Sequence, residues 1–485
     1  GSGCKQRQQI DSFALLCHRL YILSNKVKLN ALLNRGELLS DSNHTDSQPQ
    51  PSDLLQGNAD RPKVHLQSGD LPDPKQIPID QIDVSDSRLF QQDAWRPYFE
   101  RLRNEDPVHY TKDSPFGPYW SMTCFEDIMH VESRHDIFSS FPTIAIGDSP
   151  DGQYIENFIS MDPPKHDQQR MSVAPAVAPK NLALLESQIR AHAQEILDSV
   201  PEDGVVFDWV DHVSIELTTR MLATLFDFPF EDRRKLTYWS DISIGSPETT
   251  GMDEGPSQEE VMAGLNDMAA TFMGLWAERA VSDPGGRADL ITMLAHNEDT
   301  KDMINNPLEF LGNIMLLIVG GNDTTRNSIT GGVLGLNQFP EEYDKLRANQ
   351  DLIPNMVSEI VRWQTPVLHM RRTLLEDYQY KGKQMKKGDK VILWYISGNR
   401  DESAHQDADK LIIDRANARR HVSFGFGVHR CMGNRLAEMQ LRIIWEEIMQ
   451  RFDKIEVVGA ESRLKSNFIR GILKLPVKVT RKDAL

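Results

Sequence analysis

The stretch that decides the fold is Phe424-Gly425-Phe426-Gly427-Val428-His429-Arg430-Cys431-Met432-Gly433. It places one cysteine among glycines, directly before a segment, Asn434 to Met449, whose apolar residues recur at helical spacing. A cysteine at a helix N-terminus feels the positive end of the helix dipole, which favours the thiolate over the thiol. Glycines let the backbone approach a flat ligand closely. The local sequence leaves two interpretations open, a functional thiolate or an ordinary buried cysteine.

Length, charge and cysteine content restrict the class of protein. The 485 residues can form one large domain or about two or three smaller ones. The formal net charge of -17 argues against a nucleic-acid-binding protein, which would carry a basic surface. The four cysteines, at positions 4, 17, 124 and 431, form no CxxC pair, so neither a disulfide framework nor a structural zinc site is expected. This cysteine usage fits a reducing cytosol, and we expect a cytoplasmic protein.

The composition changes along the chain. Residues 36–76 are rich in Ser, Asp, Asn, Gln, Gly and Pro, so we interpret residues 1–76 as a disordered N-terminal extension and residues 77–485 as the folded body. A second break rich in Gly, Ser and Pro, at residues 240–258, predicts a mobile loop between two helices. The apolar run at residues 314–319 is far shorter than the ~20 residues of a membrane span, so no transmembrane segment is expected.

The folded body is predicted to be mainly helical, with small β-sheets to one side. Pro163 and Pro164 precede residues 165–173 and predict that a helix starts there, and apolar residues at helical spacing predict a helix over residues 182–200. Asn306 and Pro307 begin a longer helix, with Asn306 as its N-cap and Glu309 as the capping-box partner. Short strand-like runs occur near Tyr110 and at residues 119–122, 390–396 and 473–479. They are too few for a large parallel sheet.

The helix that begins at Pro307 is apolar nearly all round from Phe310 to Val319, which predicts that it is buried. It then contains Gly320-Gly321-Asn322-Asp323-Thr324-Thr325. Each glycine inside a helix costs about 1 kcal/mol relative to alanine, and polar side chains follow in a buried place. Local departures of this kind are expected at functional sites.

The cysteine stretch resembles the haem-binding signature of the cytochromes P450: Phe, two residues, Gly, one residue, His or Arg, one residue, Cys, one residue, Gly. Those places are occupied by Phe424, Gly427, His429, Cys431 and Gly433. The resemblance implies the cytochrome P450 fold and haem b (iron protoporphyrin IX) as the cofactor. It also implies that Cys431 is the ligand of the iron.

A second resemblance lies about seventy residues earlier. Glu359-Ile360-Val361-Arg362 resembles the ExxR pair of the same family. Residues three apart share one face of a helix, so Glu359 and Arg362 can form a buried ion pair. Arg415 resembles the third member of this structural network.

The polar part of the long helix resembles the distal motif of the family, which is a small residue, Gly, any residue, an acid, Thr, Thr. The resemblance implies that Asp323 and Thr324 are catalytic. Thr324 would hydrogen-bond the distal oxygen or hold a water beside it, and Asp323 would relay protons from solvent. Gly321 would leave room for oxygen above the iron.

Haem propionates need cationic or hydrogen-bonding partners in a buried setting. His166 and Arg170, four residues apart on one helical face, match family positions for this role. Arg372 fits the propionate arginine of the family by its spacing to Asp377, with Arg371 as the rival. His421 and His429 fit two further family positions.

Several stretches resemble the bacterial terminal alkane and fatty-acid hydroxylases of this family, and the resemblance covers about residues 77–485. It implies insertion of one oxygen atom from O2 into a terminal C–H bond of medium-chain alkanes or fatty acids. Such regiochemistry requires a narrow apolar tunnel that presents only the chain end. For each candidate lining residue, plain core packing is an equally open interpretation; the candidates are Leu317, Ile318, Val319, Val367, Leu368, Met370, Phe468 and Ile469.

The sequence contains no flavin or dinucleotide fingerprint and no ferredoxin cysteine cluster, so the resemblance implies a separate ferredoxin and an NAD(P)H-dependent ferredoxin reductase. Arg430, Arg435 and Arg442 are candidates for a docking patch that would attract an acidic ferredoxin. Two alternatives remain. One is a peroxide-driven haem peroxygenase, which would not need the Asp323–Thr324 pair. The other is a haem sensor or lipid carrier without enzymatic activity.

Overall fold

The computed structural model describes residues 69–149, 152, 154–245, 250, 256–287 and 289–482. The chain divides into two compact units, residues 1–56 and 57–485, and the first lies outside the described residues. The predicted disordered extension therefore falls mostly outside them. Residues 71 and 72, which the prediction placed in the extension, contact the folded body: Leu71 packs against the core, and the Tyr98 hydroxyl donates to the Pro72 carbonyl.

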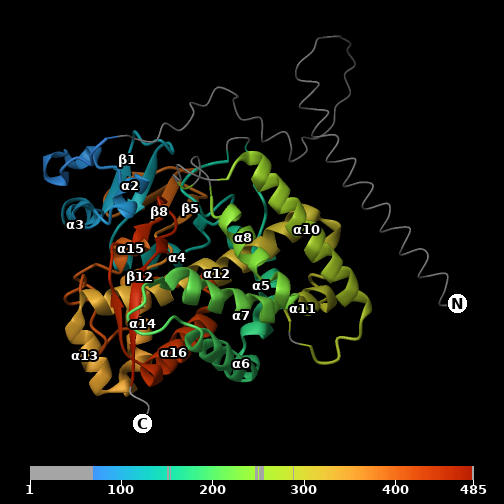
Figure 1. The fold of residues 1–485 in the computed structure, drawn as a ribbon. Helices are drawn as coiled ribbons and strands as arrows, with labels where there is room; N and C mark the ends of the chain where they lie inside the picture. Colours follow the sequence, from blue (N-terminus) through green and yellow to red (C-terminus); the bar gives the residue numbers. More distant parts are fainter. Residues whose placement is uncertain are drawn as a thin grey trace, which may run out of the picture. The chain divides into compact units, whose positions relative to one another are not determined.

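The predicted helix-rich fold is confirmed (Figure 1). No described helix combines the length and the apolar composition that crossing a membrane requires. The helices are α2 (Ser87–Gln91), α3 (Arg96–Glu105), α4 (Phe125–Glu132), α5 (Lys165–Val173), α6 (Pro179–Asp198), α7 (Glu216–Phe226), α8 (Arg234–Ser243), α10 (Gln258–Val281), α11 (Leu290–His296), α12 (Pro307–Gln338), α13 (Pro340–Ala348), α14 (Ile353–Gln364), α15 (Tyr395–Gly398) and α16 (Asn434–Arg451). The predicted loop at 240–258 is too long at its start, because residues 240–243 belong to α8; residues 246–249 and 251–255 lie outside the described residues.

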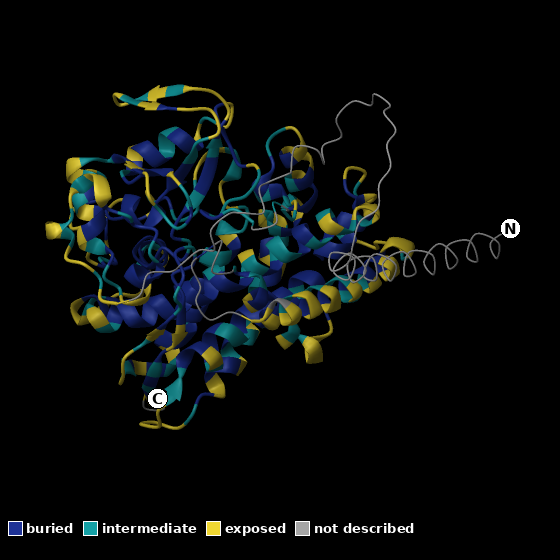
Figure 2. Ribbon diagram, turned by 90° about the horizontal axis from the view of Figure 1, so that it is seen from above, coloured by how far each residue is buried: buried dark blue, intermediate teal, exposed yellow. Residues whose placement is uncertain are grey.

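Helix α12 is the central helix of the unit, with α7, α8, α14 and α16 packed around it (Figure 1). Its second half is almost completely buried. The part from Phe310 to Val319, which was predicted to be buried, is buried at only about half of its residues; the others are partly exposed. Figure 2 shows exposed residues on the outer helix faces and turns, while the interior segments are buried. A central helix thus carries the polar sequence that contains Asp323 and Thr324.

The predicted capping box at the start of α12 is wrong. Asn306 precedes the helix, but its side chain accepts no backbone N–H. Instead its Nδ2 donates to Oε2 of Glu309 at 2.9 Å. That carboxylate also pairs with Lys165 of α5 at 3.1 Å, so a tertiary contact replaces the local cap.

The largest sheet has five strands in the order β1-β2-β8-β5-β3, and only β2 and β8 pair in parallel. The predicted strand at 390–396 ends at Leu393 because Tyr395 begins α15. The strands of this sheet are β1 (Val108–Thr111), β2 (Tyr119–Met122), β3 (Phe138–Ser139), β5 (Met370–Leu374) and β8 (Lys390–Leu393). The smaller sheets comprise β4 (Phe207–Asp208), β6 (Tyr378–Tyr380), β7 (Lys383–Met385), β9 (Phe452–Val457), β10 (Ser462–Arg463), β11 (Ile472–Lys474) and β12 (Pro476–Arg481).

A buried ion network fixes the segment that leads to the cysteine. Arg362 Nη2 lies 2.8 Å from Glu359 Oε1, and Arg415 Nε lies 3.0 Å from Glu359 Oε2. Arg362 also donates to main-chain carbonyls of Asn399, Ala408 and Lys410. Breaking a buried pair of this kind costs about 3–5 kcal/mol, because an uncompensated charge remains. The network therefore ties α14 to the chain just before the cysteine stretch.

Candidate active site

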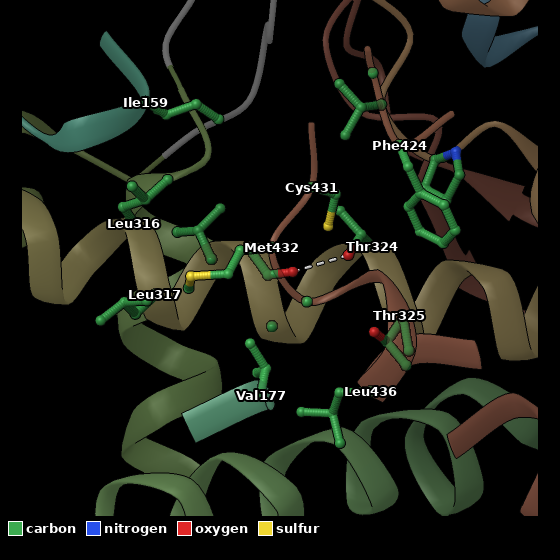
Figure 3. A pocket seen from close by; sticks show the side chains of 18 of the residues that line it. Ile159, Val177, Leu316, Leu317, Thr324, Thr325, Phe424, Cys431, Met432 and Leu436 are labelled. Atoms are coloured by element: carbon green, nitrogen blue, oxygen red, sulfur yellow. Dashed lines mark hydrogen bonds between the residues drawn. The ribbon is translucent and has the colours of Figure 1, made fainter. Parts of the chain in front are cut away.

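One large cavity lies between α12 and the cysteine stretch. Cys431 and Thr324 both line it, and Figure 3 shows the sulfur of Cys431 pointing towards the part of α12 that carries Thr324. The α12 glycines, Gly320 and Gly321, are also part of the wall. The structure thus brings together the two motifs that the sequence singled out.

The cysteine stretch forms a tight loop before α16. The Cys431 N–H donates to the Phe424 carbonyl at 2.7 Å, which closes the loop on itself. Gly427 has a φ of +67°, and a Cβ there would lie 2.2 Å from the Glu132 carbonyl oxygen. Only glycine fits at that position, because both the backbone conformation and the space exclude a side chain.

The predicted preference of Cys431 for the thiolate is not produced by the helix N-terminus alone. Burial raises the pKa of the thiol, and it outweighs the N–H groups of Gly433 and Asn434 and the guanidinium of Arg170, which lower that pKa. A thiolate at this place therefore needs a bound cation as its partner, since metal coordination deprotonates a thiol outright.

Imidazole and guanidinium groups gather at one side of the cavity. Arg170 of α5, Arg372 of β5 and His429 line it, and the His166 ring lies 4.2 Å from the His429 ring between centroids. Asp167 bonds to Nδ1 of His166 at 2.7 Å, whereas His166 Nε2 and both ring nitrogens of His429 are buried and find no partner among the described residues. Buried polar atoms without partners are rare and call for a ligand or water.

The alternation of strand β5 separates Arg372 from its rival. Arg372 lines the cavity, while Arg371 faces away and pairs with Asp148 at 2.7 Å. The sequence argument placed Arg372 at the cofactor, and its position is compatible with that role.

His421 lies apart from the other candidate cofactor-binding residues. It does not line the cavity; it lines a separate surface recess, and its ring lies 5.2 Å from that of Phe424, between centroids. Phe424 lines both the cavity and the recess, so its ring lies between them. The placement does not support His421 as a cofactor-binding residue.

Six of the eight predicted lining residues face the cavity: Leu317, Val319, Val367, Met370, Phe468 and Ile469. Ile318 and Leu368 do not, because their fully buried side chains turn into the protein core. Sequence reasoning missed the lining residues Ile159, Val177, Met221, Leu222, Leu225, Leu290, Leu316 and Leu436, some of which Figure 3 labels. Leu316 and Leu436 flank the two motifs, and the others come from segments that carry no motif.

The acid and the alcohol of α12 occupy different environments. The Thr324 hydroxyl lies in the cavity wall and donates to the Gly320 carbonyl at 2.8 Å, the dashed line in Figure 3. Asp323 lies behind the wall, fully buried, where it accepts from Ser240 Oγ at 2.6 Å and pairs with Arg326.

A charged chain connects Asp323 with the surface. Arg326 Nη1 lies 3.1 Å from Asp241 Oδ1, and the Asp241 side chain is 51% exposed. Ser240 and Asp241 belong to no motif, so sequence reasoning did not predict this connection.

Comparisons with known proteins identify the family. A model of the cytochrome P450 family matches residues 275–480. Linalool 8-monooxygenase of Pseudomonas putida is 34% identical over 418 residues, which cover 83% of this chain and 100% of the relative. The chain belongs to the cytochrome P450 family. A second relative of this P450, a methyl-branched lipid omega-hydroxylase of Mycobacterium tuberculosis, is 32% identical over 83% of this chain and 96% of its own length.

Solved P450 structures share the fold. Cytochrome P450-153 from Novosphingobium aromaticivorans is 44% identical, with a TM-score of 0.75 over 82% of this chain and 99% of that one. CYP153D17 from Sphingomonas sp. PAMC 26605 is also 44% identical, with a TM-score of 0.77 over 83% and 100%. These findings confirm the predicted family, fold and haem cofactor, and they make the protein a haem monooxygenase.

The residues of the cavity fit a haem. The Cys431 sulfur offers an iron ligand, and the unpartnered nitrogens of His166 and His429 lie beside Arg170 and Arg372, where two carboxylates can be held. A Cβ at Gly320 would meet no atom within 4 Å, so the opposite wall is open. Haem held by a cysteine thiolate supplies oxygen activation, because thiolate donation favours cleavage of the O–O bond.

Proposed function

We propose that this P450 hydroxylates the terminal methyl group of medium-chain alkanes or fatty acids, with electrons from a ferredoxin and its reductase. The observation that carries the proposal is the apolar wall of the cavity around Thr324 and Cys431. The omega-hydroxylase name of the mycobacterial relative describes the same position of attack.

We assign the roles in the cavity as follows. Cys431 holds the iron, and Phe424, Gly427 and Gly433 shape its loop. Four side chains hold the propionates: His166, Arg170, Arg372 and His429. This assignment rests on their shared placement at one side of the cavity and on the unpartnered imidazole nitrogens.

The α12 pair delivers protons in this proposal. The Thr324 hydroxyl, already in the cavity wall, holds a proton or a water at the place where oxygen reacts. Asp323 relays protons from solvent: it accepts a hydrogen bond from Ser240, and Arg326, which stays protonated, links it by ion pairs to the half-exposed Asp241. A peroxygenase needs no such route, so the pair favours the oxygen-dependent monooxygenase.

Chain-end attack depends on position rather than on reactivity, because a terminal C–H bond is stronger than an internal one. Side chains such as Leu317, Val319 and Phe468 confine the alkyl chain as it approaches the reaction site. None of these three side chains offers a polar atom that could hold the chain at an internal carbon. Correct orientation of this kind can lower the activation free energy by up to about 7–11 kcal/mol in favourable cases.

The cavity favours a neutral chain over a carboxylate. Among the described lining residues the cations are Arg170 and Arg372, both of which lie at the proposed propionate side. Burial of an unpaired carboxylate is strongly unfavourable. A fatty acid must therefore keep its carboxylate at the mouth, whereas an alkane can enter completely.

This preference is tested with an n-alkane, the fatty acid of equal length and its methyl ester, each turned over with NADH, a ferredoxin and a ferredoxin reductase. We expect the alkane and the ester to have similar KM values and the acid a KM at least about tenfold higher, since each ~1.4 kcal/mol of lost binding is tenfold. The ester controls for chain length. If the free acid had the lowest KM, a cationic side chain would bind its carboxylate, and the proposed preference for a neutral chain would be wrong.

The proposed docking patch is smaller than the sequence indicated. Arg430 and Arg435 form no ion pair within the described part of the chain and line the surface recess with Arg419. Arg442 instead pairs with Glu186 at 2.7 Å and with Glu446 at 2.8 Å, so its charge is already neutralised. An acidic ferredoxin would therefore contact Arg419, Arg430 and Arg435, and not Arg442.

A further inference from the structure

Glu132, the last residue of α4, is a buried carboxylate that the reaction does not use. Its side chain is 1% exposed. It accepts hydrogen bonds from the Tyr395 hydroxyl and from the Phe426 N–H, and Arg372 Nη2 lies 3.2 Å from its Oε1. A carboxylate in such a place is held only because each oxygen has donors.

All three partners of Glu132 belong to the haem site. Arg372 and Tyr395 line the cavity, and Phe426 lies within the cysteine loop. The loop packs directly on Glu132, because a Cβ at Gly425 would lie 3.1 Å from Glu132 Oε2. Glu132 thus connects the loop that carries the iron ligand with the arginine assigned to a propionate.

The contacts also fix the orientation of Arg372. Its Nη1 donates to the Arg371 carbonyl at 2.9 Å and its Nη2 to Glu132, which leaves other N–H groups of the guanidinium for the cavity. With a propionate bound there, one guanidinium lies between two carboxylates. A single positive charge cannot balance both.

We propose that Glu132 is a positioning residue that holds Arg372 for a haem propionate. The negative charge of Glu132 lowers the reduction potential of the haem until protonation of the carboxylate neutralises that charge. One electron from the reductant then enters together with up to one proton from solvent, which Glu132 binds. The inference rests on the proposed role of Arg372 and not on the substrate.

Few other charged groups face this carboxylate. Within the described residues they are Arg372 of β5 and Tyr395 of α15, with His429 beyond Arg372 in the cysteine loop. Burial raises the pKa of Glu132, and the contacts with Arg372, Tyr395 and Phe426 lower it by less. At high pH the ionised group disfavours an added electron, and at low pH the neutral group does not. The potential should therefore fall as pH rises.

The test is a spectroelectrochemical titration of the substrate-free holoenzyme at a series of pH values, with no ferredoxin present. For the native protein we expect a negative slope, at most about 59 mV per pH unit for one electron and one proton. Glu132→Gln should raise the potential at high pH and flatten the slope. Glu126→Gln, which removes a 66% exposed carboxylate of the same helix, should match the native protein.

A Glu132→Gln variant with the native potential and slope would overturn the proposal. If this variant does not retain haem, the same titration of Tyr395→Phe tests the proposal. Loss of a donor to the ionised carboxylate should move the sloping part of the curve to higher pH. A curve that stays in place would contradict the role of Glu132. Neither result depends on which substrate the enzyme hydroxylates.

Discussion

Replacement of Cys431 by alanine is expected to abolish the red-shifted ferrous–CO absorption band and, with it, all hydroxylation. The band arises from thiolate ligation of haem iron, and alanine offers no ligand. The other described cysteine, Cys124, cannot substitute, because it does not line the cavity. The measurement is the difference spectrum of reduced protein with and without CO.

Cys124→Ala serves as the matched control. Cys124 lies half-buried before α4, outside the cavity lining, so its variant should keep both the band and the activity. An unchanged band in Cys431→Ala would show that another residue ligates the iron.

Thr324→Ala is expected to separate electron consumption from product formation. The variant keeps the iron ligand and the apolar wall but removes the hydroxyl that faces the cavity. Positioned proton transfer contributes about 10²-fold or more to a rate, so we expect product per NADH to fall at least ~tenfold. NADH oxidation should continue, with hydrogen peroxide as the alternative product.

The conservative variant Thr324→Ser restores the hydroxyl and should recover most of the coupling. A structural role of the threonine methyl group would give the opposite pattern, with both variants equally impaired. Native coupling in Thr324→Ala would remove Thr324 from the proton route.

The cysteine loop could be predicted from the sequence because its constraints are local. Gly427 must be glycine for its backbone and its space, and His429 and Cys431 follow at fixed spacing. Glu359 and Arg362 are likewise three residues apart on one helix. Where the chemistry lies within a few residues, the sequence itself displays it.

Contacts between distant segments left no such sign. Ser240 meets Asp323 across 83 residues, and Glu132 meets Phe426 across 294. Nothing next to Ser240 or Glu132 marks either residue as a partner. Ile318 and Leu368 were wrongly predicted to line the cavity for a similar reason. An apolar residue that lines a cavity and one that packs in the core cannot be distinguished from the sequence.

The fold was predictable where one periodicity dominates. The helix predicted over residues 182–200 is α6, whereas β5 was missed because two arginines interrupt its apolar pattern. The parallel pairing of Trp120 with Val391 joins strands far apart in the chain, and no local pattern specifies it. The error at Asn306 arose because Glu309 binds Lys165 from another helix.

The proposal that the apolar cavity presents only the end of an alkyl chain is tested most directly by the position of the hydroxyl group in the product from n-octane. The native enzyme is supplied with NADH, a ferredoxin and its reductase, and the alcohols are separated and identified by mass spectrometry. We predict that 1-octanol predominates. Predominance of internal alcohols would contradict terminal hydroxylation, even if oxygen insertion itself proceeds.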